Sequence, residues 1–152
     1  MFSSLTVSLR QLLLALVLIG IVGLAIELLL LRHAESFTQL IPHITLAIGL
    51  IATAAVYFLP RSGTIKTFKL VMLLFLLVGV LGVFYHLRGN VEFALERDPT
   101  LSGMKLVWKV LRGATPALAP GALVQLGLLG LIFTYRHPAL TGSNQSKPES
   151  VD

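Results

Sequence analysis

The 152-residue chain is 55% hydrophobic and only 12% charged, with a mean hydropathy of +0.86. A soluble domain carries about 25% charged residues, so this composition excludes a water-facing globular surface and indicates apolar residues that face lipid. The absence of cysteine excludes disulfides, thiolate metal sites and a cysteine nucleophile. The net charge of +5 does not indicate nucleic-acid binding, because the basic residues are scattered between apolar segments.

Four apolar segments come close to the roughly 20 residues that a membrane-spanning helix needs. They cover residues 12–31, 40–59, 70–87 and 116–135. Their apolar runs do not alternate with polar residues, which argues against strands. The first run is too long for a signal-peptide core and lacks a small-x-small cleavage motif, so we expect it to be retained. The predicted fold class is therefore all-α: a polytopic bundle of four transmembrane helices in one domain, residues 1–138.

The connections between these spans differ in length. The first two are short, and the first of them predicts that the first and second spans are antiparallel neighbours. The third connection contains "LSGMKLVWKVLRG", residues 101–113, which predicts a short amphipathic helix with Lys105, Lys109 and Arg112 on one face. With Trp108 suited to an interface, this helix could lie on the membrane surface, or it could pack on the bundle. The polar tail, residues 139–152, is predicted to be disordered.

The direction of insertion follows weakly from the positive charges. Four spans place both termini on one side, and six basic residues fall on each side of the membrane. This balance leaves the positive-inside rule undecided. The second connection, "PRSGTIKTFK", is short and carries three basic residues, which is typical of cytoplasmic loops. We therefore expect both termini to be cytoplasmic.

Small residues predict where the helices approach one another, because lipid provides no hydrophobic drive for helix association. Thr45, Gly49 and Thr53 follow one another at intervals of four residues in the second span. Gly121 and Gln125 have the same spacing in the fourth span. We expect both stripes to face neighbouring helices, with Gln125 hydrogen-bonded to one of them.

Polar side chains gather at the membrane face formed by the first and third connections. This candidate cluster comprises Glu27, Arg32, His33, Glu35, His43, His86, Asn90 and Glu92. Glu27 lies inside an apolar run, where a charged side chain costs a few kcal/mol. We therefore expect Glu27 to be coupled to the histidines rather than to face lipid. The coupling could be a structural pair or a functional site.

Metal binding is one possible use of this cluster. His33, His43 and His86 with Glu27 would suit zinc or copper(II), although no HExxH or HxxxH spacing is present. Haem ligation by two of these histidines is conceivable, but their spacing does not predict it. The GxSxG, P-loop and GxGxxG motifs are all missing. The sequence thus names no cofactor and points away from an enzyme.

Three blocks carry a resemblance: "ELLLLRHAESFTQLIPH", "GNVEFALERDPTLSG" and "LRGATPALAPGALVQLGLLGLIFTYRHP". They resemble a family of small bacterial four-helix membrane proteins to which no function is assigned. The resemblance implies the bacterial inner membrane and implies no activity.

Two functional hypotheses follow from these patterns. The first is a non-enzymatic subunit or accessory protein that packs against other membrane proteins or against itself. The alternative is a metal- or proton-handling protein that uses the histidine and glutamate cluster. A solute transporter is a weaker third hypothesis, because four short helices make a narrow bundle without an evident pair of broken helices.

Overall fold

The computed structural model describes residues 2–31, 36–113 and 118–141, and within these ranges the regular structure is entirely helical. The helices are α1 (Phe2–Leu30), α2 (Phe37–Phe58), α3 (Ser62–Arg97), α4 (Gly103–Leu111), α5 (Leu118–Thr134) and α6 (Pro138–Thr141). The predicted all-α fold class is confirmed for this part of the chain. The helix α6 includes the first residues of the predicted tail, and residues 142–152 lie outside the described ranges.

Three of these helices are long and apolar enough to cross a membrane: α1 over Leu9–Leu30, α2 and α3. This finding supports a membrane protein. The helix α5 is also apolar, but its 17 residues make it shorter than the other three. The predicted fourth span began at residue 116, and residues 114–117 lie outside the described part of the chain.

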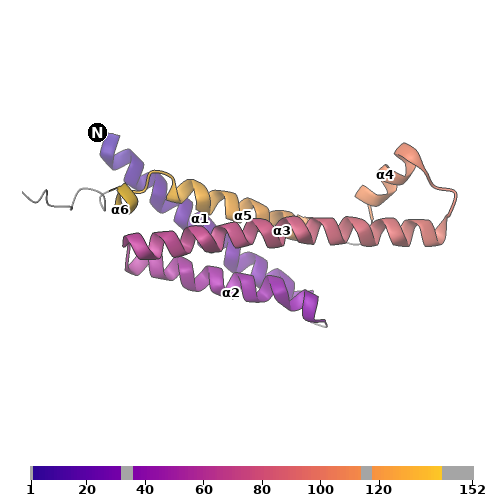
Figure 1. Ribbon diagram of the computed structural model, residues 1–152, viewed down its shortest axis with the longest axis horizontal. Coiled ribbons are helices and arrows are strands. Elements are labelled where there is room, and N and C mark those ends of the chain that lie inside the picture. The colour runs from indigo at the N-terminus through magenta and orange to yellow at the C-terminus, as the bar shows by residue number, and fades with distance from the viewer. Residues whose placement is uncertain (1, 32–35, 114–117, 142–152) are drawn as a thin grey trace, which may run out of the picture.

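The helix α3 is much longer than the predicted span, which was limited to residues 70–87. It has 36 residues, which corresponds to a length of about 54 Å. The residues after Leu87 include several polar ones, but most of the segment favours helix, and Arg88 pairs with Glu92 one turn later at 2.9 Å. The helix ends at Arg97, two residues before Pro99. In Figure 1, α3 therefore runs past α1, α2 and α5 and carries α4 at its far end.

The helix α2 begins three residues before the predicted boundary because Ser36 caps it. The Gln39 backbone N–H donates to the Ser36 hydroxyl at 3.4 Å, and the Gln39 side chain accepts from the Ser36 backbone N–H at 3.2 Å. This reciprocal capping box satisfies two backbone donors that would otherwise lack partners at the start of the helix.

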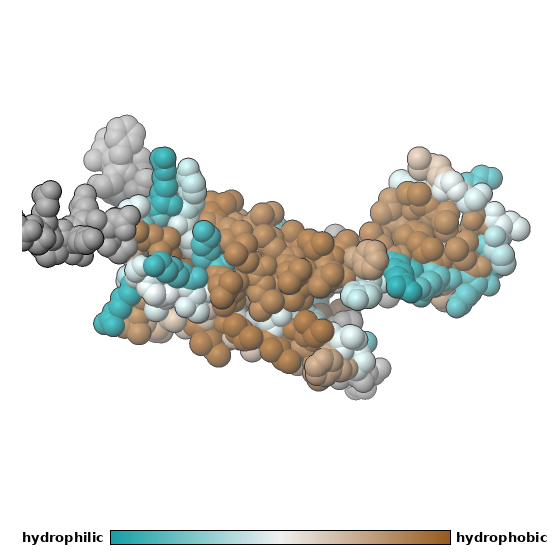
Figure 2. All heavy atoms as spheres, viewed as in Figure 1, coloured by the Kyte–Doolittle hydropathy of each residue, from teal (hydrophilic) through white to brown (hydrophobic). Residues whose placement is uncertain are grey.

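Four helices surround the core as a ring of neighbours. The helix α1 contacts α2 and α5, and α3 also contacts α2 and α5. The largest fully buried side chains between them are Val17, Ile21, Leu46, Ile65, Phe68, Met72 and Phe75. Figure 2 shows a broad hydrophobic band on the outside of these helices, with hydrophilic residues gathered at both ends. Such a band is what a protein exposes to lipid rather than to water.

The closest approach is between α3 and α5, which run antiparallel. A Cβ atom on Gly79 would lie 2.8 Å from the carbonyl oxygen of Pro120, and one on Gly127 would lie 2.8 Å from the carbonyl oxygen of Met72. At one end of the pair, the rings of Phe68 and Phe133 meet edge to face at 5.5 Å. Glycine thus allows the two backbones to touch, which is the usual means of helix association in lipid.

The stripe predicted on α2 does face the core. Thr45 and Thr53 are buried, and their hydroxyls donate to backbone carbonyls of their own helix, those of Ile41 at 2.8 Å and Gly49 at 2.7 Å. A Cβ atom on Gly49 would overlap the ring of Phe75 from α3. The small stripe therefore lies at the contact between α2 and α3.

The stripe predicted on α5 does not face a neighbouring helix of the described chain. Nothing lies within 4 Å of a Cβ atom built on Gly121, and the side chain of Gln125 is exposed. The close contacts of α5 are made by Gly127 and Gly130 instead. The reason is the rotation of the helix: the buried Leu123 and Leu126 direct the opposite side of α5 toward the core.

Candidate interaction surfaces

The predicted polar cluster is only partly described. Arg32, His33 and Glu35 lie outside the described residues. Glu27 is exposed on α1, and no hydrogen bond or ion pair joins it to another described side chain. Among the described residues, no group of three histidine, aspartate or glutamate side chains is arranged to hold a metal ion. Arg32 and His33, the expected partners nearest to Glu27 in the sequence, are not among the described residues. The pairing of Glu27 with the histidines therefore stays a prediction.

His43 lies half-buried in α2, beside α1. Its Nδ1 donates to the Gln39 carbonyl at 3.1 Å, since a carbonyl can only accept. The other ring nitrogen, Nε2, is buried without a hydrogen-bond partner among the described residues. The ring borders a shallow apolar groove of about 290 Å³ between α1 and α2, and Glu27 is not among the lining residues.

Asn90 and Glu92 belong to the part of α3 that projects beyond the other helices, and His86 lies half-buried one turn before Asn90. Asn90 is only 5% exposed, and its Nδ2 donates to the Val110 carbonyl at 3.1 Å. That carbonyl belongs to the last turn of α4 and also accepts the backbone N–H of Gly113 at 3.1 Å. A Cβ atom on Gly113 would overlap the Asn90 amide. Asn90 therefore fastens α4 to α3.

The helix α4 has three distinct faces. The first, with Leu106 and the buried Val110, packs toward α3. The second, here called the α4 stripe, is apolar yet exposed and comprises Met104 (78%), Val107 (50%), Trp108 (56%) and Leu111 (62%). The third is the exposed basic face predicted from the sequence, Lys105, Lys109 and Arg112. The guanidinium of Arg112 stacks on the Trp108 ring at 4.4 Å, which joins the basic face to the stripe.

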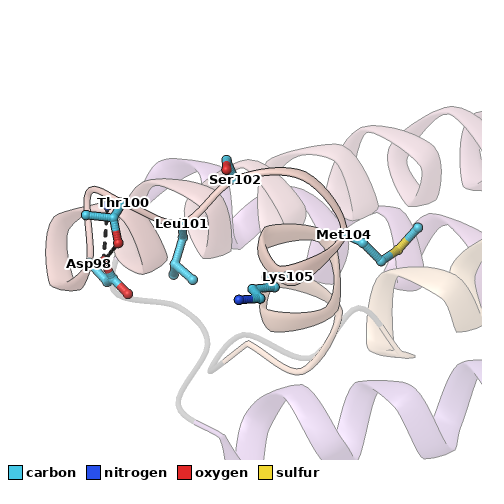
Figure 3. A pocket seen from close by; sticks show the side chains of 6 residues that line it. All are labelled: Asp98, Thr100, Leu101, Ser102, Met104 and Lys105. Atoms are coloured by element: carbon cyan, nitrogen blue, oxygen red, sulfur yellow. Dashed lines mark hydrogen bonds between the residues drawn. The ribbon is translucent and has the colours of Figure 1, made fainter.

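An open hollow of about 420 Å³ lies at the turn between α3 and α4 (Figure 3). On its border, Asp98 accepts hydrogen bonds from the Thr100 hydroxyl at 2.6 Å and from the Thr100 backbone N–H at 3.1 Å. These two bonds, the hydroxyl bond first, hold the pKa of Asp98 below its ordinary value. Both are local bonds that close the turn, so the carboxylate serves the connection between the two helices.

The outer face of α5 carries a polar side chain in apolar surroundings. Gln125 is exposed, and so are Leu128 (49%) and Ile132 (57%) on the same side of the helix. No hydrogen bond connects Gln125 to another described residue. Gly121, one turn earlier, leaves open space beside the amide. This combination of a polar group and an unoccupied backbone approach is what an interface between membrane helices requires.

The opposite end of the molecule is held together by Arg10 and His137. Arg10 donates from Nη2 to the Arg136 carbonyl at 3.0 Å, which ties α1 to the corner between α5 and α6. The His137 Nδ1 accepts the Ala139 backbone N–H at 3.2 Å, at the start of α6. Burial, and secondarily the charge of Arg10, lowers the pKa of His137. The neutral ring is the form that can accept this bond.

Aromatic residues mark both ends of the hydrophobic band, a signal that the sequence analysis missed. Tyr57 and Phe58 meet edge to face at 5.0 Å at the end of α2, and Tyr135 follows α5. Phe84 and Tyr85 meet at 5.6 Å in the other half of α3, before Trp108 of α4. Adjacent aromatic residues near the ends of apolar runs could have been recognised as membrane-interface belts.

The described chain thus defines a class: an all-helical protein with three helices long and apolar enough to cross a membrane. Comparison of the chain with protein-family models, curated proteins and solved structures finds no match.

Replacing Asn90 with leucine is expected to release α4 from α3. The substitution removes the side-chain donor to the Val110 carbonyl, which keeps its bond from the Gly113 backbone, so the loss is about 0.5–1.5 kcal/mol. Backbone amides of residues 104–112 should exchange hydrogen faster, while those of α3 around Phe75 stay protected. Glu96→Gln, at an exposed position of the same projecting segment, is the matched control. Unchanged exchange in α4 would mean that other contacts hold it.

Proposed function

We propose that this chain is a four-span protein of the bacterial inner membrane that serves as a non-enzymatic subunit or accessory protein, packing against other membrane-spanning helices. The observation that carries the proposal is the exposed Gln125 amide on the apolar outer face of α5. In hydrocarbon such an amide has no water to bond, so it favours a partner that brings a hydrogen-bonding group. The open Gly121 beside it allows a second helix to come close.

The fourth span in this proposal is α5. It follows α3 closely, from the contact of Pro120 with Gly82 to that of Phe133 with Phe68. Because α5 packs along α3 over this length, it covers the same depth of the bilayer as that part of α3. Tyr135 then stands at the same interface as Tyr57, which suits an aromatic belt.

The orientation with cytoplasmic termini is supported by the charges at the two ends. The basic residues of the terminal end are Arg10, Arg61, Lys66, Lys69 and Arg136. All four described acidic residues lie toward the opposite end, which is formed by the first and third connections: Glu27, Glu92, Glu96 and Asp98. Acidic residues contribute little to the positive-inside rule, so this orientation is supported mainly by the short second connection with Arg61, Lys66 and Lys69, which is typical of cytoplasmic loops.

The helix α4 is proposed to stand at the opposite headgroup layer. A hydrocarbon core of about 30 Å takes about 20 helical residues, which leads from Lys69 to Gly89 of α3. Asn90 holds the last turn of α4 at this level. The basic face could then bind lipid phosphates, while Trp108 and Leu111 enter the interface.

Reporter fusions and purification test this proposal together. Fusions after Gly63 and at the C-terminus should report the cytoplasm, and a fusion near Asp98 should report the periplasm. In mild detergent the chain should purify with another membrane-spanning chain, of its own or of a different kind, and Gln125→Leu should weaken that association. Opposite locations for the first two fusions would contradict four spans. Association that is indifferent to Gln125 would contradict the role of α5.

A further inference from the structure

The outer face of α5 is a regular seam rather than a single polar position. Its members are Gly121, Gln125, Leu128 and Ile132 of α5, and Tyr135, which directly follows the helix. They follow one another at intervals of four, three, four and three residues, which is the heptad spacing of helices that pack as left-handed pairs. Gln125, Leu128, Ile132 and Tyr135 are exposed, and Gly121 has open space beside it. The outer face of α3 has exposed residues at similar intervals, from Leu70 to Phe84, but all of them are apolar, so the Gln125 amide is what distinguishes the α5 seam.

The depth of Gln125 prevents it from reaching water. It lies seven residues after the first residue of α5 and nine before the last, so about 10 Å and about 13 Å of helix separate it from the two ends. A glutamine side chain does not extend over two turns of helix. If α5 spans the bilayer, as the proposed function requires, the amide therefore needs a partner at its own depth.

We propose that this partner is the Gln125 of a second copy of the chain, with the two α5 helices paired in parallel across a two-fold axis along the membrane normal. Copies that insert in the same direction carry Gln125 at the same depth. An amide both donates and accepts, so two of them are mutually complementary. The two-fold contact is isologous, with each residue of the seam meeting the same face of its copy.

The chemistry of the seam suits a second copy of the chain. None of its five residues is charged, so two identical faces meet without repulsion between like charges. Gly121 allows the backbones to approach next to the amide pair, and Leu128 and Ile132 supply apolar contact on the other side. A single polar residue in a heptad seam selects register and oligomeric state, which is the role assigned here to Gln125.

Cysteine cross-linking can test the seam, because the natural chain contains no cysteine. Leu128→Cys introduces a thiol into the seam and keeps Gln125. Leu77→Cys is the matched control, because Leu77 is 58% exposed on α3. It also lies at about the same depth as Leu128, since Gly79 contacts Val124 and Met72 contacts Gly127 across the two helices. In phospholipid vesicles at low protein-to-lipid ratio, oxidation should link the Leu128→Cys chains and leave the Leu77→Cys chains monomeric. Equal cross-linking of the two variants would overturn the proposal.

The amide pair is tested in the Leu128→Cys background. Gln125→Leu should weaken association about 3- to 30-fold, the equivalent of the 0.6–2 kcal/mol of an interhelical hydrogen bond in lipid. Gln125→Asn, which retains an amide, should restore much of it. Circular dichroism of each variant should match the parent, since the position faces outward. Association that Gln125→Leu leaves unchanged would overturn the pairing.

The outcome also separates this inference from the proposed function on which it rests. If Leu128→Cys fails to cross-link while Gln125→Leu removes a different membrane protein from the purified complex, the second copy is wrong and the accessory role stands. If Gln125→Leu affects neither self-association nor any complex, both proposals fail.

Discussion

Replacing Gly79 with alanine is expected to lower the free energy of unfolding by about 1–3 kcal/mol, the usual cost of overpacking a tight contact. The new methyl would lie 2.8 Å from the carbonyl oxygen of Pro120 and 2.8 Å from the backbone nitrogen of Val124. Both are backbone atoms, and neither can rotate away as a side chain can. The helices α3 and α5 would have to separate, at the closest interface in the described chain.

Denaturation in one detergent, followed by circular dichroism, measures this effect. Gly23→Ala on α1 is the matched control, because nothing lies within 4 Å of a Cβ atom there. It should be neutral or slightly stabilising, since alanine favours helix over glycine by about 1 kcal/mol. Gly127→Ala, which would meet the Met72 carbonyl oxygen, should behave like Gly79→Ala. Equal midpoints for Gly79→Ala and Gly23→Ala would contradict the close packing of α3 and α5.

Replacing Lys105, Lys109 and Arg112 together with glutamate is expected to detach α4 from an anionic bilayer. Each basic residue near such a surface contributes about 1 kcal/mol, so removing three loses about 3 kcal/mol, and the new negative charges add repulsion. The change also removes the stacking of Arg112 on Trp108. The membrane-spanning helices should insert as before, because their apolar lengths are untouched.

Trp108 reports this change directly, because it is the only tryptophan in the chain. Its fluorescence should be quenched by brominated lipids in the natural chain and less so in the triple variant. Lys66→Glu with Lys69→Glu, at the opposite end of α3, serves as a control for altered charge elsewhere. Equal quenching in the natural chain and the triple variant would mean that Asn90 and the packing of Leu106 and Val110, rather than lipid, decide where Trp108 lies.

Helix ends show both the success and the limit of prediction from the sequence. Apolar runs predicted α1, α2 and α3 as membrane-length helices, because burial in lipid demands both apolar side chains and complete backbone hydrogen bonding. The apolar run of α3 stops at Leu87, and so did the predicted membrane span. The helix itself continues to Arg97, because polar residues there still favour helix and Asn90 binds α4. Polarity marks where a span leaves the membrane and does not mark where its helix ends.

The polar cluster shows a similar limit. Histidines and acids were grouped because they belong to the same membrane face, which sequence position can indicate. Whether they meet depends on how each helix is rotated, and His43 turned to its own helix backbone while Asn90 turned to α4. The helix propensities and the composition carry no information about that rotation.

The faces on which the helices pack show most clearly what the sequence determines and what only the tertiary structure decides. The amino-acid sequence by itself determined that the described part of the chain is helical and apolar enough for a membrane, and it predicts that α4 is amphipathic. Small residues occur on several sides of the helices, so their spacing alone does not identify the packing face. The spacing predicted a close contact at Gly49, which the structure has, but on α5 it selected Gly121, whereas Gly127 makes the contact. Only the tertiary structure decided which side of α5 is inside, because that depends on the fit of Gly79, Pro120 and Met72 across two helices. The same fit left Gln125 outside, since one helix cannot turn both faces to a single neighbour.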